Sequence, residues 1–404
     1  MPLDPVAFFR ACNPSKTLTF AEDVERDYYV DFGSVRAGSR SGVSLIQEMV
    51  RTISRSDAPC HQLFTGHIGS GKSTELHKLK LDLEQAGFHV VLLDSSDDLV
   101  MSDVDFSDIL LVIAKAIDAS LTAHQIRLRA EGFAGFLQNT MNVLQREVSL
   151  EGEATIPGLG HLSAESSGQA TLSVPGVGKI TARLKENANA RERLRQYLEP
   201  RSNNLLELIN GELIDPATAR LKEQGRQGLV VIVDSLDRLE DTRERSQAEY
   251  IFLTRGEQLR QLHSHMVYTV PMVLNFSDAI APLSDRFGGQ PKVLPMVRVL
   301  NRDGSDFLVG MKLLRQMILA RAFPALSPEE REDHLGEVFE DPALCHRLCR
   351  VSGGHVRNLL VLLYGCLQKE DPPIRRDTLE EVIATQRDSY ARAVTTTQWQ
   401  LLQR

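Results

Sequence analysis

The amino-acid sequence predicts an α/β fold in which helices flank a parallel sheet of about five strands. Residues 61–93 follow the order apolar strand, glycine-rich loop, helix, strand, and this order is typical of parallel sheets. A further apolar strand, at 229–233, is followed directly by an aspartate. From residue 304 onward the spacing of apolar residues is helical, which predicts a helical region after the sheet.

The composition is that of a globular protein. The chain has 404 residues, of which 42% are hydrophobic and 25% charged, enough for two or three packed cores. A net charge of -8 gives no general attraction to nucleic acid or to anionic lipid. Five cysteines without regular spacing, and a start without a signal-peptide pattern, favour the cytoplasm. Apolar runs are far shorter than the roughly 20 residues of a membrane-spanning helix, so we expect no membrane contact.

The first elements lie in a leader and in the sheet domain. We expect the leader, residues 1–58, to pack on the next domain through a helix near Val43–Ile53. The sheet domain, residues 59–300, begins with a strand at His61–Thr65, a loop at Gly66–Gly71, a helix at Lys72–Gln85, a strand at Phe88–Leu93 and a helix at Phe106–Leu121.

An insertion at 130–225 separates these elements from the next strand. Within it, Ile156–Leu162 is echoed by Val174–Ile180, and the short alternating segments predict a β-hairpin or small sheet. The polar run Arg183–Glu199 favours an exposed helix, and Leu205–Ile214 a buried one.

The remaining elements complete the sheet and then turn helical. A helical lid is expected over residues 301–371 and a helical tail over 372–404. The expected elements are a strand at Leu229–Val233, a helix at Glu244–Leu262, strands at Met266–Val270 and Val293–Val299, and lid helices at Phe307–Ala320, Ala343–Val351 and Val356–Leu367.

The glycine-rich loop fits the pattern G-x-x-x-x-G-K-[ST] at every required position, between a strand and an amphipathic helix. In this pattern backbone N–H groups surround phosphates, the lysine reaches the β and γ phosphates, and the hydroxyl after it binds Mg²⁺. The sequence therefore predicts binding of Mg²⁺ and ATP. The predicted phosphate-binding residues are Gly66, His67, Ile68, Gly69, Ser70, Gly71, Lys72, Ser73 and Thr74, with Ser73 also a metal ligand.

An acidic residue at the end of a neighbouring strand would hold Mg²⁺ through water, and Asp234 is the candidate. Asp237 is a candidate to polarise the attacking water, and its alternative interpretation is an ion pair with Arg238 at the surface.

Four segments together resemble the origin-recognition and STAND branches of the AAA+ superclass of P-loop ATPases. These are Gly66–Leu76, Val231–Leu239, Tyr268–Pro271 and Ser352–Arg357, and the resemblance covers about two thirds of the chain. It implies an AAA+ fold with a C-terminal lid. Many hydrolytic AAA+ proteins have a glutamate base where this chain has Ser235, a departure that favours a slow switch over a motor.

The resemblance also assigns roles to individual residues. Thr269 or Asn275 would be the sensor that contacts the γ-phosphate or the attacking water, and Arg357 would be a second sensor on the lid. Arg286 would be an arginine finger for the ATP of a neighbouring subunit, which implies self-association. A solvated surface arginine is the alternative for both arginines.

Weaker signals have structural explanations. Cys345, His346 and Cys349 lack a second ligand pair and suit a buried helix face better than a zinc site. His67 and His355 lie near the predicted pocket, but neither is required by the motif. The basic residues of 179–195 suit a salt-bridged helix face, with DNA contact as the alternative.

Three functions remain open from the sequence. The first is a slow ATPase that acts as a conformational switch for a separate client or effector protein, as in bacterial signalling or defence. The second is a DNA-remodelling or loader ATPase, although residues 372–404 are short for a complete DNA-reading domain. The third is a nucleotide-binding scaffold without turnover.

Overall fold

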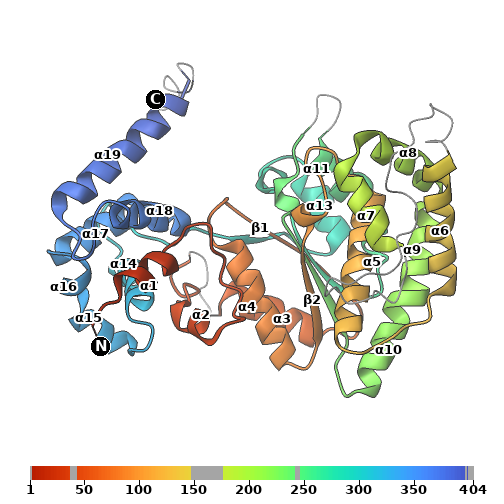
Figure 1. Cartoon of the computed structure of the whole chain (residues 1–404), viewed down its shortest axis with the longest axis horizontal. Helices are drawn as coiled ribbons and strands as arrows, with labels where there is room; N and C mark the ends of the chain where they lie inside the picture. Colours follow the sequence, from red (N-terminus) through yellow and green to blue (C-terminus); the bar gives the residue numbers. More distant parts are fainter. Residues whose placement is uncertain (1, 37–42, 147–175, 242–245, 396–397, 399–404) are drawn as a thin grey trace, which may run out of the picture. The chain divides into compact units, whose positions relative to one another are not determined.

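The computed structural model has an α/β fold, and its residues form two compact units (Figure 1). The first unit comprises Met1–Glu48, Gly66–Lys78 and Leu294–Arg404, and the second comprises Met49–Thr65 and Leu79–Val293. The structure describes residues 2–36, 43–146, 176–241, 246–395 and 398.

A five-stranded parallel sheet has the strand order β2-β3-β4-β1-β5. Strand β3 is buried along its whole length, as its run of aliphatic residues predicts. Asp94 on β2 lies opposite Asp234 on β3, so these two strands end in register. The strands are β1 (His61–Gly66), β2 (His89–Asp94), β3 (Leu229–Asp234), β4 (His265–Thr269) and β5 (Lys292–Leu294).

In the second unit, α5 packs on β2 and β3 and is covered in turn by α7 and α9 (Figure 1). The start of α5 is fixed because the carboxylate of Asp108 accepts a hydrogen bond from the backbone N–H of Asp105, at 2.9 Å. The helices are α5 (Phe106–Ala123), α6 (Glu131–Arg146), α7 (Val177–Glu186), α8 (Ala188–Leu198), α9 (Ser202–Leu208), α10 (Asp215–Glu223), α11 (Gln247–Glu249), α12 (Gly256–Leu259) and α13 (Ile280–Phe287).

In the first unit, α1 and α2 of the leader pack against α14. Their shared core includes Phe8, Phe32, Val297, Leu314 and Leu363. Helices α3 (Leu45–Ser54) and α4 (Lys72–Gln85) begin in this unit and end in the other. The others are α1 (Pro5–Ala11), α2 (Asp23–Tyr28), α14 (Leu308–Ala322), α15 (Pro328–Asp333), α16 (Leu335–Val338), α17 (Pro342–Val351), α18 (Val356–Leu367) and α19 (Arg376–Ala393).

The structure confirms the parallel sheet, the helix at Lys72–Gln85 and the helix at Val356–Leu367. It describes only the last residues of the predicted hairpin. Ile156–Leu162 lies outside the described residues, but the end of its echo begins α7 and is helical. Val177 and Ile180 are both buried, and their spacing of three places them on one helix face.

Three further predictions of elements were wrong in extent. The last strand ends at Leu294 because Pro295 follows and has no N–H for the ladder. The expected helix at Arg183–Glu199 is divided at Asn187, whose side chain accepts a hydrogen bond from the N–H of Ala190 and starts α8. The expected helix at Glu244–Leu262 is broken into α11, a π-helical turn at Tyr250–Thr254 and α12.

Candidate functional site

The glycine-rich loop leaves β1 at Gly66 and enters α4 at Lys72. Gly69 has φ +81° and Gly71 has φ +97°, a backbone conformation that side chains other than glycine rarely adopt. The N–H of Ser70 donates to the carbonyl of His67, at 3.1 Å, and closes the turn. Loops of this kind turn successive N–H groups toward one concave face, which suits an anion.

Lys72 lies at the start of α4 and is buried. Its Nζ donates to the carbonyl oxygens of Gly66, at 2.8 Å, and of His67, at 3.0 Å, so the ammonium group is held across the loop. Ser73 and Thr74 follow in the first helical turn and are half-buried. The partial positive charge of the helix N-terminus adds to that of the lysine.

The loop is packed too tightly for side chains at two glycines. A Cβ on Gly66 would lie 2.8 Å from the carbonyl oxygen of Leu294. A Cβ on Gly69 would overlap the ring of His355, and it would lie 2.9 Å from the Cβ of Arg357. Of these two glycines the motif requires only Gly66, so the packing at Gly69 is a feature that the motif does not reveal.

Helix α18 begins directly against the loop. The backbone N–H of Arg357 donates to the carbonyl oxygen of Gly69, at 3.2 Å. The Nδ1 of His355 accepts the N–H of Asn358, at 3.1 Å, and caps the helix. Burial lowers the pKa of His355, while a hydrogen bond to the backbone of Ile68 acts in the opposite direction. The motif does not require His355, but the structure places its ring against Gly69 of the loop. The guanidinium of Arg357, the predicted second sensor, is exposed.

A Gly-Gly turn sets the approach of α18. Gly353 has φ +62° and Gly354 has φ +78°. The carbonyl of Gly354 accepts the N–H of Val297, at 3.1 Å, and a Cβ on Gly354 would overlap the carbonyl oxygen of Val297. This close backbone contact explains why glycine is needed at Gly354.

The acidic and hydroxyl candidates of the second unit gather at the carboxyl ends of β2, β3 and β4. Asp234 is buried, and its Oδ1 accepts the N–H of Ser235, at 2.7 Å. The hydroxyl of Thr269 donates to the carbonyl of Val233, at 3.3 Å. The structure thus brings together Asp94, Asp234 and Thr269 at one edge of the sheet, as predicted for Asp234 and Thr269.

Asp94 is held as an acceptor at the same edge. Its Oδ1 accepts the hydroxyl of Ser96, at 2.6 Å, and the backbone N–H of Ser96, at 2.9 Å. Burial opposes ionisation, but these hydrogen bonds outweigh it and lower the pKa of the carboxyl group. Ser235 has φ +68°, so the chain turns sharply between Asp234 and Leu236.

The remaining candidates of the second unit lie on short helices. Asp237 is half-buried on the 3₁₀ turn Leu236–Arg238, and Asn275 ends the 3₁₀ turn Met272–Asn275. Arg286 is on α13, 26% exposed, and its Nε lies 3.3 Å from the Oε1 of Glu257.

The leader supplies two residues that sequence reasoning missed. The Nη2 of Arg36 donates to the carbonyl of Ser70, at 2.9 Å, and lies 3.7 Å from the Oε1 of Glu75. The hydroxyl of Tyr29 donates to the other oxygen of Glu75, at 3.2 Å. Neither residue belongs to a motif, and the only signal in the sequence is an arginine and a tyrosine within an otherwise weakly patterned leader.

A small cavity of about 50 Å³ lies beside the loop within the first unit. The residues around it combine aromatic rings, aliphatic side chains and two buried arginines. They include Tyr29, Phe32, Arg36, Gly71, Thr74 and Val356.

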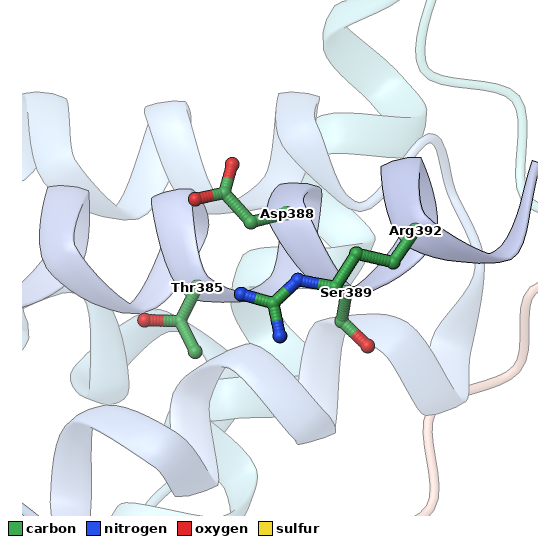
Figure 2. A pocket seen from close by; sticks show the side chains of 4 residues that line it. All are labelled: Thr385, Asp388, Ser389 and Arg392. Carbon is green, nitrogen blue, oxygen red and sulfur yellow. The ribbon is translucent and has the colours of Figure 1, made fainter.

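A second hollow, of about 580 Å³, is lined, among the residues that the structure describes, by side chains of α19. Figure 2 shows its four side chains, Thr385, Asp388, Ser389 and Arg392, along that single helix. Because one helix lines it and none of the predicted site residues takes part, we do not assign it a function.

The basic and cysteine signals have the structural explanations expected. Arg191 pairs with Asp103 at 2.8 Å, and Arg195 pairs with Asp108 at 2.8 Å and also with Asp103. Cys345 and Cys349 are buried in the core of the first unit. Among the described residues, no three or more His, Cys, Asp or Glu side chains are placed to hold a metal ion.

Comparison with known proteins gives no assignment, because no family model matches the chain and no curated protein matches it significantly. Within the described part of the chain, none of the helices has the length and apolar character needed to cross a membrane. The fold and the loop therefore define the chain as an α/β protein with a parallel sheet and a glycine-rich loop between β1 and α4.

Proposed function

We propose that the chain is a P-loop ATPase of the AAA+/STAND type that acts as a slow, nucleotide-dependent switch. The observation that carries this proposal is the loop itself. Its glycine conformations, the position of Lys72 at the start of α4 and the packing that excludes a Cβ at Gly66 all suit a bound phosphate chain.

The residues fit Mg²⁺ and ATP by their chemistry. Lys72 would neutralise the β and γ phosphates, and Ser73 and Asp234 offer the oxygen ligands that Mg²⁺ prefers. The cavity of about 50 Å³ beside the loop is too small for a base, so no base site is assigned to it. When bound, Mg²⁺ would offset the charge that develops on the phosphates.

The contact between Arg357 and Gly69 supports a switch, because it links the loop to the first turn of α18. A change in the loop on binding or release of the γ-phosphate would change the position of α18. It would thereby change the affinity for a client protein bound to that helix. The coupling needed is about 1 to 3 kcal/mol, the typical range for allosteric proteins. We propose self-association and a separate effector protein as the partners.

The experiment is titration calorimetry of the full chain with Mg-ATP and Mg-ADP, together with phosphate release. Wild type should bind both nucleotides, and Lys72→Ala should weaken binding of Mg-ATP by about 100-fold or more. The matched control is Lys80→Ala, because Lys80 is on the same helix but pairs with Glu84. Absence of binding to wild type, or equal binding by Lys72→Ala, would overturn the proposal, while binding without phosphate release would indicate a scaffold.

A further inference from the structure

Arg36 is a buried residue of the leader, with 8% of its surface exposed. Its backbone forms an antiparallel bridge with Val297, and the carbonyl of Val35 accepts the N–H of Arg298, at 3.5 Å. The main chain of the leader is therefore fixed at this point by pairing that does not depend on the arginine side chain.

Only one of the three guanidinium nitrogens has a hydrogen-bond partner among the described residues. One nitrogen, Nη2, makes the hydrogen bond to Ser70 and approaches Glu75. The ring of Phe32 lies 5.6 Å from the guanidinium carbon. The other two nitrogens, Nε and Nη1, are buried, and among the described residues neither finds a hydrogen-bond partner.

Such an arrangement is costly for a side chain whose only role is packing. A buried donor without a partner lowers stability, and more so when it is charged. A methionine would fill the same space without that cost. We therefore expect the guanidinium group to make a contact with the loop that an apolar side chain could not make.

The hydrogen bond to Ser70 sets the orientation of one peptide group. The peptide bond between Ser70 and Gly71 is trans, so its C=O and N–H point in opposite directions. Because Arg36 holds the C=O on the leader side, the N–H of Gly71 is turned away from the leader. Gly71 itself is close above the arginine, since a Cβ there would lie 3.6 Å from Nη2.

The preceding carbonyl is held in the same manner. The C=O of Gly69 accepts the N–H of Arg357, so two successive carbonyls of the loop are bound by donors from outside it. One donor comes from α18 and the other from the leader. Together they oppose any flip of the two peptide groups that would turn a carbonyl oxygen toward a bound anion.

We propose that Arg36 is a positioning residue of the phosphate loop, which keeps the Ser70–Gly71 peptide oriented with its N–H available to a phosphate. The proposal rests on the proposed nucleotide binding and goes beyond it, because it assigns the shape of the loop to a residue outside the motif. Removing the guanidinium should weaken binding of phosphate groups and leave binding of the nucleoside unchanged.

The test compares Arg36→Met and Arg36→Lys with a matched control, Arg331→Met. Arg331 is also buried in the first unit and donates to backbone carbonyls, to Phe323 at 3.0 Å and to Pro324 at 2.9 Å, without contacting the loop. The probes are inorganic pyrophosphate, Mg-ADP and adenosine, each titrated into the full chain, with thermal unfolding measured in parallel.

Arg36→Met should weaken pyrophosphate and Mg-ADP about 10-fold or more, with adenosine unchanged within twofold. Arg36→Lys, which retains a donor, should recover part of the loss, and Arg331→Met should bind all three probes as wild type does. If Arg36→Met does not fold, Arg36→Lys becomes the test variant and Arg331→Lys its control. Arg36→Lys should then bind pyrophosphate several-fold more weakly than Arg331→Lys.

Three results would overturn the proposal. Unchanged binding of pyrophosphate by both Arg36 variants would show that Arg36 has no role in phosphate binding, while the proposed nucleotide site would stand. An equal loss for adenosine and for pyrophosphate would place the effect in general folding and not in the phosphate loop. No binding of Mg-ADP by wild type would overturn the proposed function itself, a result that needs no variant to recognise.

Discussion

The backbone N–H of Arg357 and the carbonyl oxygen of Gly69 form a hydrogen bond of 3.2 Å across a separation of 288 residues in the chain. The bond involves main-chain atoms only, so the identity of residue 357 does not determine it. What determines it is the position of α18, which depends on the two glycines before the helix and on the cap made by His355.

The first prediction concerns those two glycines. Gly353→Ala should cost roughly 1 kcal/mol, because only the positive φ is unfavourable and no atom lies within 4 Å of the added carbon. Gly354→Ala should cost about 3 kcal/mol or more, because the added carbon also meets the carbonyl of Val297. Urea unfolding of both variants measures the difference, and equal costs would contradict the close contact.

The second prediction separates the roles of the acids on and after β3. Asp237→Asn should lower phosphate release by about 100-fold or more with the affinity for Mg-ATP unchanged, as expected for a group that polarises water. Asp234→Asn should weaken binding that depends on Mg²⁺. A rate that does not change in Asp237→Asn shows that the assignment of the base is wrong.

The third prediction concerns Arg286. If it acts as a finger on the ATP of a neighbouring copy, Arg286→Ala should lower turnover by about 1,000-fold while oligomers still form. Glu257→Gln is the control, since it removes the ion-pair partner of Arg286 and keeps the arginine. Mass photometry with and without nucleotide, beside phosphate release, gives both readouts. Turnover at the wild-type rate in Arg286→Ala would show that Arg286 is not an arginine finger.

The fourth prediction is a pH dependence of stability. Burial, followed by the charges of His124, Arg226 and Lys80, lowers the pKa of His89 to about 4. The unfolded chain therefore binds a proton at His89 that the folded chain does not, near and below pH 6.5, and stability falls as the pH falls from 6.5 toward 4. We expect on the order of 1 to 2 kcal/mol from His89 between pH 7 and pH 5.

His89→Gln should reduce that loss, because glutamine does not take up a proton and can still bond to Ser120, whose Oγ lies 2.9 Å from Nε2 of the histidine. The measurement is the urea midpoint at pH 7 and pH 5, and His263→Gln, at an exposed position, is the control. The same pH dependence in His89→Gln and wild type would exclude this histidine as the cause.

The elements that the sequence predicted best are those determined by neighbours in the chain. The loop, α4 and α18 follow from contiguous glycines, a helical period and local caps, so Lys72–Gln85 and Val356–Leu367 matched in both bounds. The helix expected at Glu244–Leu262 failed because its breaks depend on contacts made elsewhere. The interruption lies at Arg255, with φ −100° and ψ 1°, between the π-helical turn and α12.

The same distinction applies to the candidate site. Asp234 and Thr269 could be placed because each ends a strand, and parallel strands end at one edge. Arg36, Tyr29 and His355 could not, because each reaches the loop through folding of a distant segment. Their residue types are common at surfaces, and only burial and the contact with Ser70, Glu75 or Gly69 distinguishes them.

The order in which a ribosome releases the chain gives the contact between Gly69 and Arg357 a further consequence. Synthesis adds about 5 to 20 residues per second, so the segment that carries Arg357 emerges tens of seconds or less after the loop. During this interval the carbonyl of Gly69 lacks its hydrogen-bond partner. Long-range pairings of this kind also slow folding in general. A nascent chain should thus acquire the hydrogen bond between Arg357 and Gly69 late, and under the proposed function the loop would reach its final geometry for nucleotide only after the segment of α18 has been made.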